Sequence, residues 1–268
     1  KVMFKSHPKG LIPAALANMG ERFGYYIMNA VLVLFLCSKF GVSGELSAGI
    51  YSVFYTSIYI LALLGGFIAD KTRNYKGTIM SGLVVMALGY VVLSIPILAT
   101  PQNSMGLLAL TCGALALIAF GNGLFKGNLQ ALVGQMYDNP QYADKRDAGF
   151  QIFYVFINIG GLVAPFVAPY LREWWLGTHE MMYNASLPEL CHNYIANGEA
   201  MSGLENLKTL MVACGGDINN LATSCAEYLK IFNEGVHYSF LASVAAMLIS
   251  LAIFIATRKI YPTPAKKE

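Results

Sequence analysis

Polar and charged side chains interrupt the first long apolar segment of the chain, AALANMGERFGYYIMNAVLVLFL. A charged side chain in the middle of a membrane costs about 2.5 to 3.5 kcal/mol on insertion scales, so it is retained where it faces a bundle interior or a water-filled path. At about 100° per residue, these side chains form one polar stripe on an otherwise apolar helix. The stripe predicts the wall of a transport cavity. Its members are Asn18, Glu21, Arg22, Tyr25, Tyr26 and Asn29.

A single lysine, Lys126, lies far from either end of a second apolar segment, GALALIAFGNGLFKGNLQALVG. A lysine at this depth requires a partner. Glu21 and Arg22 are adjacent and point about 100° apart, so they are expected to satisfy each other poorly. The sequence therefore favours an ion pair between Glu21 and Lys126 that titrates during transport. The alternative is a lysine that only holds two helices together.

Neutral polar side chains complete the candidate site. Tyr51, Tyr55 and Tyr59 recur every four residues and would line one strip of a helix. Tyr59 is the candidate for a cavity hydroxyl, because the others lie closer to the membrane boundary, where tyrosine is common without a binding role. Asn158 precedes a pair of glycines in another apolar segment, and its amide could bind substrate or only bond to a neighbouring helix.

Six apolar segments must position these residues, and each is long enough to cross about 30 Å of hydrocarbon. They cover residues 11–38, 46–69, 77–99, 104–137, 148–172 and 236–257. The chain is 56% hydrophobic and 12% charged, whereas soluble domains are roughly 25% charged. It is therefore expected to be an all-α integral membrane protein.

Three glycines around Lys126 would let neighbouring backbones approach closely. These are Gly121, Gly123 and Gly127.

The basic residues indicate the orientation. Most of them fall on one side of the membrane, and the positive-inside rule then places both ends of the chain in the cytoplasm. That side holds Lys1, Lys5, Lys9, Lys71, Arg73, Lys76, Lys145, Arg146, Arg258, Lys259, Lys266 and Lys267. The other side holds Lys39, Arg172, Lys208 and Lys230. The net charge of +3 is thus a topology signal, and we expect no nucleic-acid partner.

One connection, residues 173–235, is long and is expected to be an extracytoplasmic insert of two or three short helices. The predicted organisation is 1–172 for transmembrane helices 1–5, 173–235 for the insert, and 236–268 for transmembrane helix 6 and a cytoplasmic linker. Cys214 and Cys225 are the preferred disulfide pair. The alternative is that Cys191, Cys214 and Cys225 are all small buried apolar residues.

Catalysis and metal binding are not expected. The histidines, at positions 7, 179, 192 and 237, form no HExxH motif and have no paired aspartate on the same span. The sequence therefore predicts neither an enzyme, nor a metal site, nor a cofactor.

Five motifs, in this order along the chain, resemble the signatures of the proton-coupled oligopeptide transporter (POT) family of the major facilitator superfamily. They are GERFGYY at 20–26, GGFIAD at 65–70, GNGLFKGN at 121–128, FYVFINIGGLVAP at 153–165 and VHYSFLASVAAM at 236–247. The resemblance implies the six-helix amino-terminal bundle of a major facilitator fold. It also implies a carboxy-terminal six-helix half as a partner, and we expect this chain to be the amino-terminal part of such a transporter.

The resemblance also implies roles for individual residues. Glu21 and Lys126 would take part in proton coupling, and Asp70, in a cytoplasmic loop, would act in gating. The implied substrate-binding residues are Arg22, Tyr25, Tyr26, Tyr59, Lys126 and Asn158.

Two positions depart from the family pattern. Asn18 stands where the motif has its first glutamate, and Asn29 where a basic residue is common, so one titratable acid and one cation are absent. The expected function is still symport of di- and tripeptides with protons across a bacterial inner membrane. One alternative is a carrier of a non-peptide or uncoupled substrate. The other is a membrane binding or scaffold fragment that does not transport.

Overall fold

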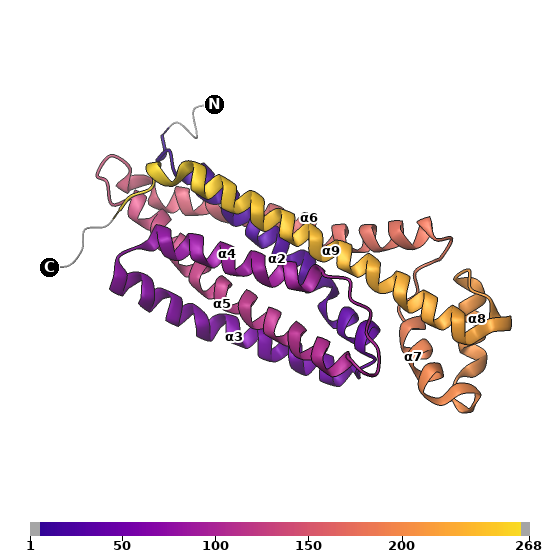
Figure 1. Ribbon diagram of the computed structural model, residues 1–268. Coiled ribbons are helices and arrows are strands. Elements are labelled where there is room, and N and C mark those ends of the chain that lie inside the picture. Colours follow the sequence, from indigo (N-terminus) through magenta and orange to yellow (C-terminus); the bar gives the residue numbers. More distant parts are fainter. Residues whose placement is uncertain (1–5, 264–268) are drawn as a thin grey trace.

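The computed structural model describes residues 6–263, and every regular element in that range is a helix. Six of these helices are long and apolar enough to cross a membrane. They are α2 (Leu11–Phe40), α3 (Gly44–Thr72), α4 (Tyr75–Ser94), α5 (Ser104–Met136), α6 (Arg146–Thr178) and α9 (Leu221–Thr257). Two short helices, α7 (Leu187–Asn197) and α8 (Leu204–Ala213), lie together at one end of the bundle (Figure 1). Short 3-10 turns cover Ala143–Lys145, Gly198–Ala200, Ile218–Asn220 and Arg258–Ile260.

The six predicted spans are confirmed, but some of their boundaries are wrong. The helix α4 ends at Ser94 instead of residue 99, because Ile95 precedes Pro96 and has an extended backbone, with ψ of 115°. The predicted domain boundaries at 172/173 and 235/236 fall inside α6 and α9. The expected third helix of the insert is the first part of α9, since no helix-stopping turn separates it from the membrane span.

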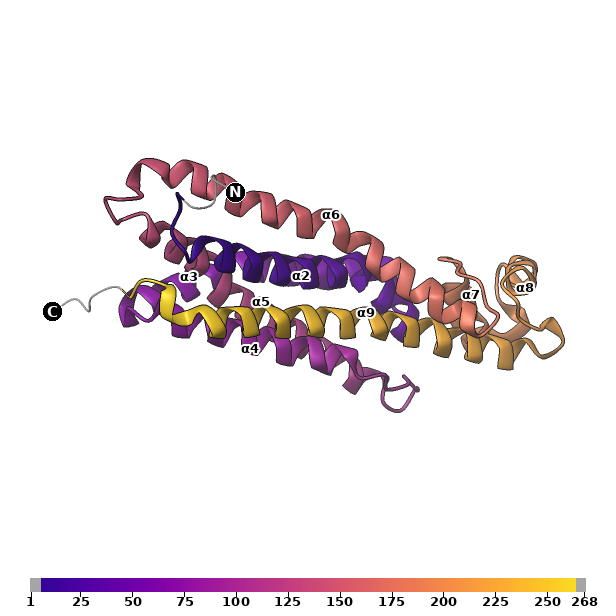
Figure 2. The ribbon, with the colours of Figure 1, turned by 90° about the horizontal axis from the view of Figure 1, so that it is seen from above.

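The long helices form two groups of three. In one group α2 packs against α6 and α9, and in the other α5 packs against α3 and α4, while α4 and α9 join the groups (Figures 1 and 2). The first and fourth spans therefore hold equivalent positions, as in the three-helix inverted repeats of some transporters. Because α2 contacts α3 and α5 more sparsely, there is room for a cavity between these three helices.

Glycines set the distances between helices of the second group. A Cβ added at Gly121 would lie 2.6 Å from the carbonyl oxygen of Gly82 on α4. A Cβ at Gly123 would lie 2.6 Å from the carbonyl carbon of Leu61 on α3. The helix α5 thus touches the backbones of both neighbours, as expected for small residues in a membrane bundle. Gly127 has no such neighbour within 4 Å, so the expectation that it also serves close packing is wrong.

The first and last described residues meet at the same end of the bundle. Gly10 lies close to Tyr261, and Lys76 donates hydrogen bonds of 3.2 Å to the carbonyl oxygens of Arg258 and Tyr261. The helices α7 and α8 lie at the opposite end (Figure 1). This arrangement agrees with the prediction that both ends of the chain lie on the same side of the membrane. Four basic residues used for the orientation lie outside the described residues, namely Lys1, Lys5, Lys266 and Lys267.

The five cysteines are free, so the predicted disulfide between Cys214 and Cys225 is wrong. The helix α7 packs against α9 and brings Cys191 next to Cys225, whereas Cys214 lies beside Tyr228. The hydrogen bond with Cys225, followed by burial, raises the pKa of the Cys191 thiol far above its usual value. Burial also raises the pKa of Cys214. The three insert cysteines are buried, which confirms the alternative of small core residues.

Candidate functional site

A cavity of about 280 Å³ lies between α2, α3 and α5. It collects four residues of the polar stripe of the first span, the tyrosine strip of the second and the lysine of the fourth. Asn18 and Glu21, the other two residues of the predicted stripe, are buried and do not line it. The cavity is lined by Arg22, Tyr25, Tyr26, Asn29, Tyr51, Tyr55, Ile58, Tyr59 and Lys126. Two of its lining side chains are cationic and none is acidic.

Glu21 and Arg22 form a two-point ion pair. Arg22 Nε lies 2.5 Å from Glu21 Oε2, and Arg22 Nη2 lies 2.6 Å from Oε1. Asn122 on α5 donates a further hydrogen bond of 2.7 Å to Oε1. The predicted pair between Glu21 and Lys126 is therefore wrong. The long arginine side chain bridges the angle between adjacent helix positions, and Asn122 holds the carboxylate from the other side.

The two members of this ion pair differ in their access to the cavity. Glu21 is 0% exposed and stands behind the cavity wall, while Arg22 is 8% exposed and lines the cavity. The guanidinium carbon lies 4.4 Å from the centroid of the Tyr25 ring and 5.7 Å from that of Tyr26. Contacts of this type favour a cation over an aromatic face. Arg22 is thus fixed by a carboxylate on one side and by aromatic rings on the other.

Lys126 is the free cation of the cavity. Its Nζ lies 5.2 Å from the centroid of the Tyr59 ring, and within residues 6–263 no carboxylate is near enough to form an ion pair with it. The hydroxyls of Tyr55 and Tyr59 are 2.9 Å apart and share a hydrogen bond. The cavity therefore presents an ammonium group beside linked phenols, which suits a ligand with a carboxylate and further polar groups.

Two amide oxygens near the cavity are buried and have no hydrogen-bond partner. They are Asn29 Oδ1, in the cavity wall, and Asn122 Oδ1, behind it. A buried acceptor without a donor costs about 1–3 kcal/mol. Asn29, one of the departures from the family pattern, is therefore ready to accept a hydrogen bond from a ligand N–H.

The sequence analysis did not identify Asn122, and it assigned Tyr59 to the cavity but not Tyr51 or Tyr55. Asn122 precedes Lys126 by four residues, so its place on the same helix face was readable. Tyr51 and Tyr55 line the cavity together with Tyr59. The signal for them was their four-residue spacing.

Besides Glu21, two more predicted site residues do not line the cavity. Asn158 is exposed on α6 and does not line it. Asp70, in the last turns of α3, accepts a hydrogen bond from the hydroxyl of Tyr75 at the start of α4. Asp70 therefore ties two helices together at their connection, and its gating role stays a prediction.

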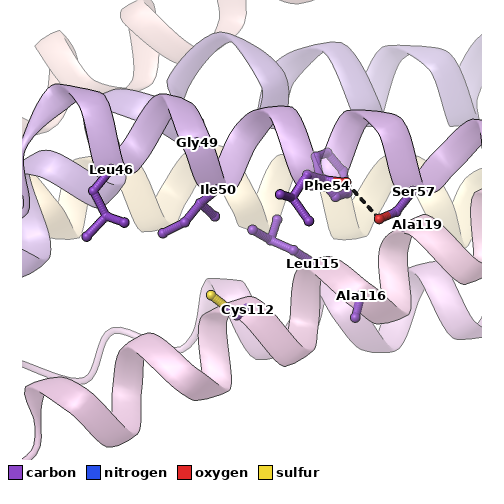
Figure 3. Close-up of a pocket in the computed structure, with 10 residues that line it drawn as sticks. Leu46, Gly49, Ile50, Phe54, Ser57, Cys112, Leu115, Ala116 and Ala119 are labelled. Atoms are coloured by element: carbon purple, nitrogen blue, oxygen red, sulfur yellow. Dashed lines mark hydrogen bonds between the residues drawn. The ribbon is translucent and has the colours of Figure 1, made fainter.

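A separate groove of about 360 Å³ lies between α3 and α5 (Figure 3). Its walls are apolar, with Leu46, Ile50 and Leu115 facing the space. The hydroxyl of Ser57 already donates to the carbonyl oxygen of Val53, at 2.7 Å. No charged residue lines this groove, so it offers no recognition of a charged ligand.

Asn122→Ala is expected to lower the free energy of unfolding by roughly 1–2 kcal/mol, because loss of a hydrogen bond to a charged acceptor outweighs removal of the unpartnered amide oxygen. Chemical unfolding of the purified chain in detergent, followed by circular dichroism, measures this loss. Asn29→Ala is the matched control. Its oxygen has no partner, so its removal is expected to leave stability at the wild-type level or above it. Equal losses in both variants would contradict the role of Asn122.

Comparison with known proteins identifies related membrane transporters. A family model described as the POT family matches residues 76–268. The chain is 31% identical over 175 residues to the uncharacterized transporter YclF of Bacillus subtilis strain 168, covering 63% of this chain and 33% of that protein. It is 34% identical over 166 residues to dipeptide and tripeptide permease B of Shigella dysenteriae serotype 1, covering 62% of this chain and 32% of the permease. The chain thus spans about a third of the length of these curated relatives.

Solved structures show the same fold. A crystal structure of a peptide transporter POT in complex with sulfate superposes with a TM-score of 0.63 at 27% identity, covering 94% of this chain and 38% of the other. The tetrameric PepTSo2 superposes with a TM-score of 0.66 at 22% identity, covering 93% of this chain and 40% of the other. The six-helix bundle is therefore an arrangement that larger transporters contain.

Proposed function

Because this chain belongs to the POT family, we propose that it forms the amino-terminal six-helix part of a transporter that imports small peptides together with protons. The chain is a multi-pass membrane protein with an all-helical transporter fold, and membership of this family agrees with the prediction that it is not an enzyme. The name of the dipeptide and tripeptide permease relative supports peptides as substrates. Its bacterial relatives support placement in a bacterial inner membrane. The distribution of basic residues along the chain supports an orientation with both ends in the cytoplasm.

The single observation that carries this proposal is the free ammonium group of Lys126 in the cavity wall. A peptide carboxylate would bind this group without displacing an internal ion pair. The hydroxyls of Tyr55 and Tyr59 and the free oxygen of Asn29 would then bond to amide groups of the peptide. A partner half of the transporter would close the opposite side of the site.

Proton coupling is proposed to act through Glu21. A proton on Glu21 would remove the negative charge that holds Arg22, and the guanidinium could then move from its place against Tyr25 toward a substrate. Lys126 remains the second proposed coupling residue. Asn158 is proposed to contact substrate only after the halves rearrange, because it is exposed on α6. Asp70 is proposed to act in gating through its bond to Tyr75.

The test compares a dipeptide with its carboxy-terminal amide, using the complete transporter that contains this chain, across a range of pH. We expect the free acid to bind at least about tenfold more tightly, which corresponds to about 1.4 kcal/mol. Lys126→Met is expected to remove this preference. Lys71→Met, at an exposed position near the end of α3, is the control and is expected to keep it.

Equal binding of acid and amide by the unmutated transporter would contradict recognition of a carboxylate by Lys126. Peptide uptake that does not change with pH would instead support the uncoupled alternative. A protein that binds neither compound and moves no peptide would contradict peptide transport and would leave the carrier of a non-peptide substrate and the scaffold as the alternatives.

A further inference from the structure

A cavity of about 300 Å³ lies between the end of α4, the end of α6 and the helix α9. Trp175 lines it from α6, and four residues line it from α9, namely Glu234, His237, Tyr238 and Leu241. These four are spaced three, one and three positions apart, so they share one face of the helix. No residue of this cavity belongs to the transport cavity.

The cavity contains a carboxylate without a cationic partner. Glu234 Oε2 accepts a hydrogen bond of 3.2 Å from the indole Nε1 of Trp175. Within residues 6–263, neither oxygen of Glu234 forms an ion pair with a lysine or an arginine. Lys230, one turn earlier on α9, is exposed and does not pair with it. The indole therefore holds the carboxylate in place without neutralising its charge.

The histidine in the cavity wall adds no positive charge. His237 Nδ1 lies 2.7 Å from the carbonyl oxygen of Leu93, which can only accept, so Nδ1 carries the proton. His237 Nε2 lies 2.9 Å from Nζ of Lys39 and therefore accepts a hydrogen bond from it. The imidazole is thus neutral, and Lys39 does not line the cavity. Among the lining residues that the structure describes, Glu234 is the charged one.

Two aromatic rings line the cavity beside this carboxylate. The ring centroids of Trp175 and Tyr238 lie 4.8 Å apart, and the ring planes are inclined at 52° to each other. Tyr238 follows Glu234 by four residues, so the two side chains are neighbours on the surface of α9. Trp174 packs edge-on against Tyr238, with ring centroids 5.9 Å apart. The faces of tryptophan and tyrosine rings attract cations, and aromatic cavities of this kind recognise quaternary ammonium groups.

We propose that this cavity binds an ammonium group, as the headgroup of a zwitterionic phospholipid or as a free amine. The cation would lie between the carboxylate of Glu234 and the rings of Trp175 and Tyr238. Tryptophan and tyrosine are enriched at the level of the lipid headgroups, and the cavity lies where two membrane-spanning helices, α4 and α6, end. This site goes beyond the proposed function, because it shares no residue with the transport cavity.

The test uses the fluorescence of Trp175. The chain has two tryptophans, so Trp174→Phe leaves Trp175 as the reporter of the cavity. The full chain is titrated in detergent with choline or with its neutral analogue, in which carbon replaces the nitrogen. It is also compared in nanodiscs of phosphatidylglycerol with and without phosphatidylethanolamine.

We expect the fluorescence to change with choline, with phosphatidylethanolamine or with both, and not with the neutral analogue. A response to both would show that the ammonium group itself is recognised, and a response to one of them would identify the source. No response to either, or an equal response to choline and to its neutral analogue, would overturn the proposal.

Variants in the same background link the response to the cavity. Glu234→Gln keeps an oxygen for the Trp175 indole but removes the charge, and it is expected to weaken binding at least about tenfold. Tyr238→Leu removes one ring and is expected to weaken binding about two- to fivefold, whereas Tyr238→Phe keeps the ring and the affinity. Glu227→Gln, at an exposed position on α9, is the matched control and is expected to leave binding unchanged. Unchanged binding by Glu234→Gln would also overturn the proposal.

Discussion

Gly123→Ala is expected to lower the free energy of unfolding by about 3 kcal/mol, at the upper end of the usual cost of overpacking. The added Cβ would lie 2.6 Å from both the carbonyl carbon and the carbonyl oxygen of Leu61, and 3.0 Å from the nitrogen of Ala62. These are backbone atoms, so no side-chain rotation relieves the contact and α3 must move away from α5. Chemical unfolding of the chain in detergent measures the loss.

Gly127→Ala is the matched control, one helical turn further along the same helix. It adds the same methyl group where nothing lies within 4 Å. The better helix propensity of alanine is worth up to about 1 kcal/mol, so this variant is expected to be as stable as wild type or slightly more stable. Equal losses in the two variants would contradict the close packing of α3 on α5.

The same contact bears on the transport cavity. Leu61 and Gly123 lie close in sequence to Tyr59 and Lys126, which face each other across the space between α3 and α5. Spreading the helices would separate the ammonium group from the phenols. Gly123→Ala is therefore expected to weaken peptide binding by the complete transporter, whereas Gly127→Ala is not expected to change the helix spacing.

Glu21→Gln is the second change with a large expected effect, a loss of about 3 kcal/mol in the free energy of unfolding. It leaves the Arg22 guanidinium, which is 8% exposed, without its carboxylate. Arg22→Met is expected to be similarly costly, since it leaves a fully buried carboxylate with only Asn122 as partner. The double variant is expected to lose less than the sum, because neither charge then remains unpaired.

An exposed ion pair provides the control. Lys208 Nζ lies 3.2 Å from Glu205 Oε1, with side chains that are 39% and 87% exposed. Because solvent screens such a pair, Glu205→Gln is expected to change stability by less than about 1 kcal/mol. A Glu21→Gln chain as stable as Glu205→Gln, or additive losses in the double variant, would contradict a buried and coupled pair.

The Glu21→Gln variant also imitates the protonated carboxyl group. In the complete transporter, its peptide uptake is expected to become independent of pH if Glu21 is the coupling acid. Uptake that keeps the wild-type pH profile would instead assign coupling to another group, with Lys126 as the next candidate.

Much of the fold was predictable because it depends on local periodicity. The long apolar runs specify six spans, and the fixed rotation of a helix places Arg22, Tyr25 and Asn29 on one face whatever surrounds them. The predicted start and end of α2 and α5 agree with the structure within two residues. The boundaries of α9 were not predictable in the same way, because the insert sequence and the membrane span are both helical and join without a stop.

The contacts between helices were less predictable. The partner of Glu21 depended on the reach of the Arg22 side chain and on Asn122 arriving from α5. Which cysteine meets Cys225 depended on how α7 lies against α9. The exposed position of Asn158 likewise follows from the rotation of α6 within the bundle.

The sequence by itself determined the membrane class, the six helices and the polar face of the first, because these follow from hydrophobicity and from a repeat of 3.6 residues per turn. Only the tertiary structure decided which charges are paired and which is free. Helix register and rotation are set by close backbone contacts, such as those of Gly121 and Gly123, between residues far apart in the chain. Local sequence patterns carry no information about those distances.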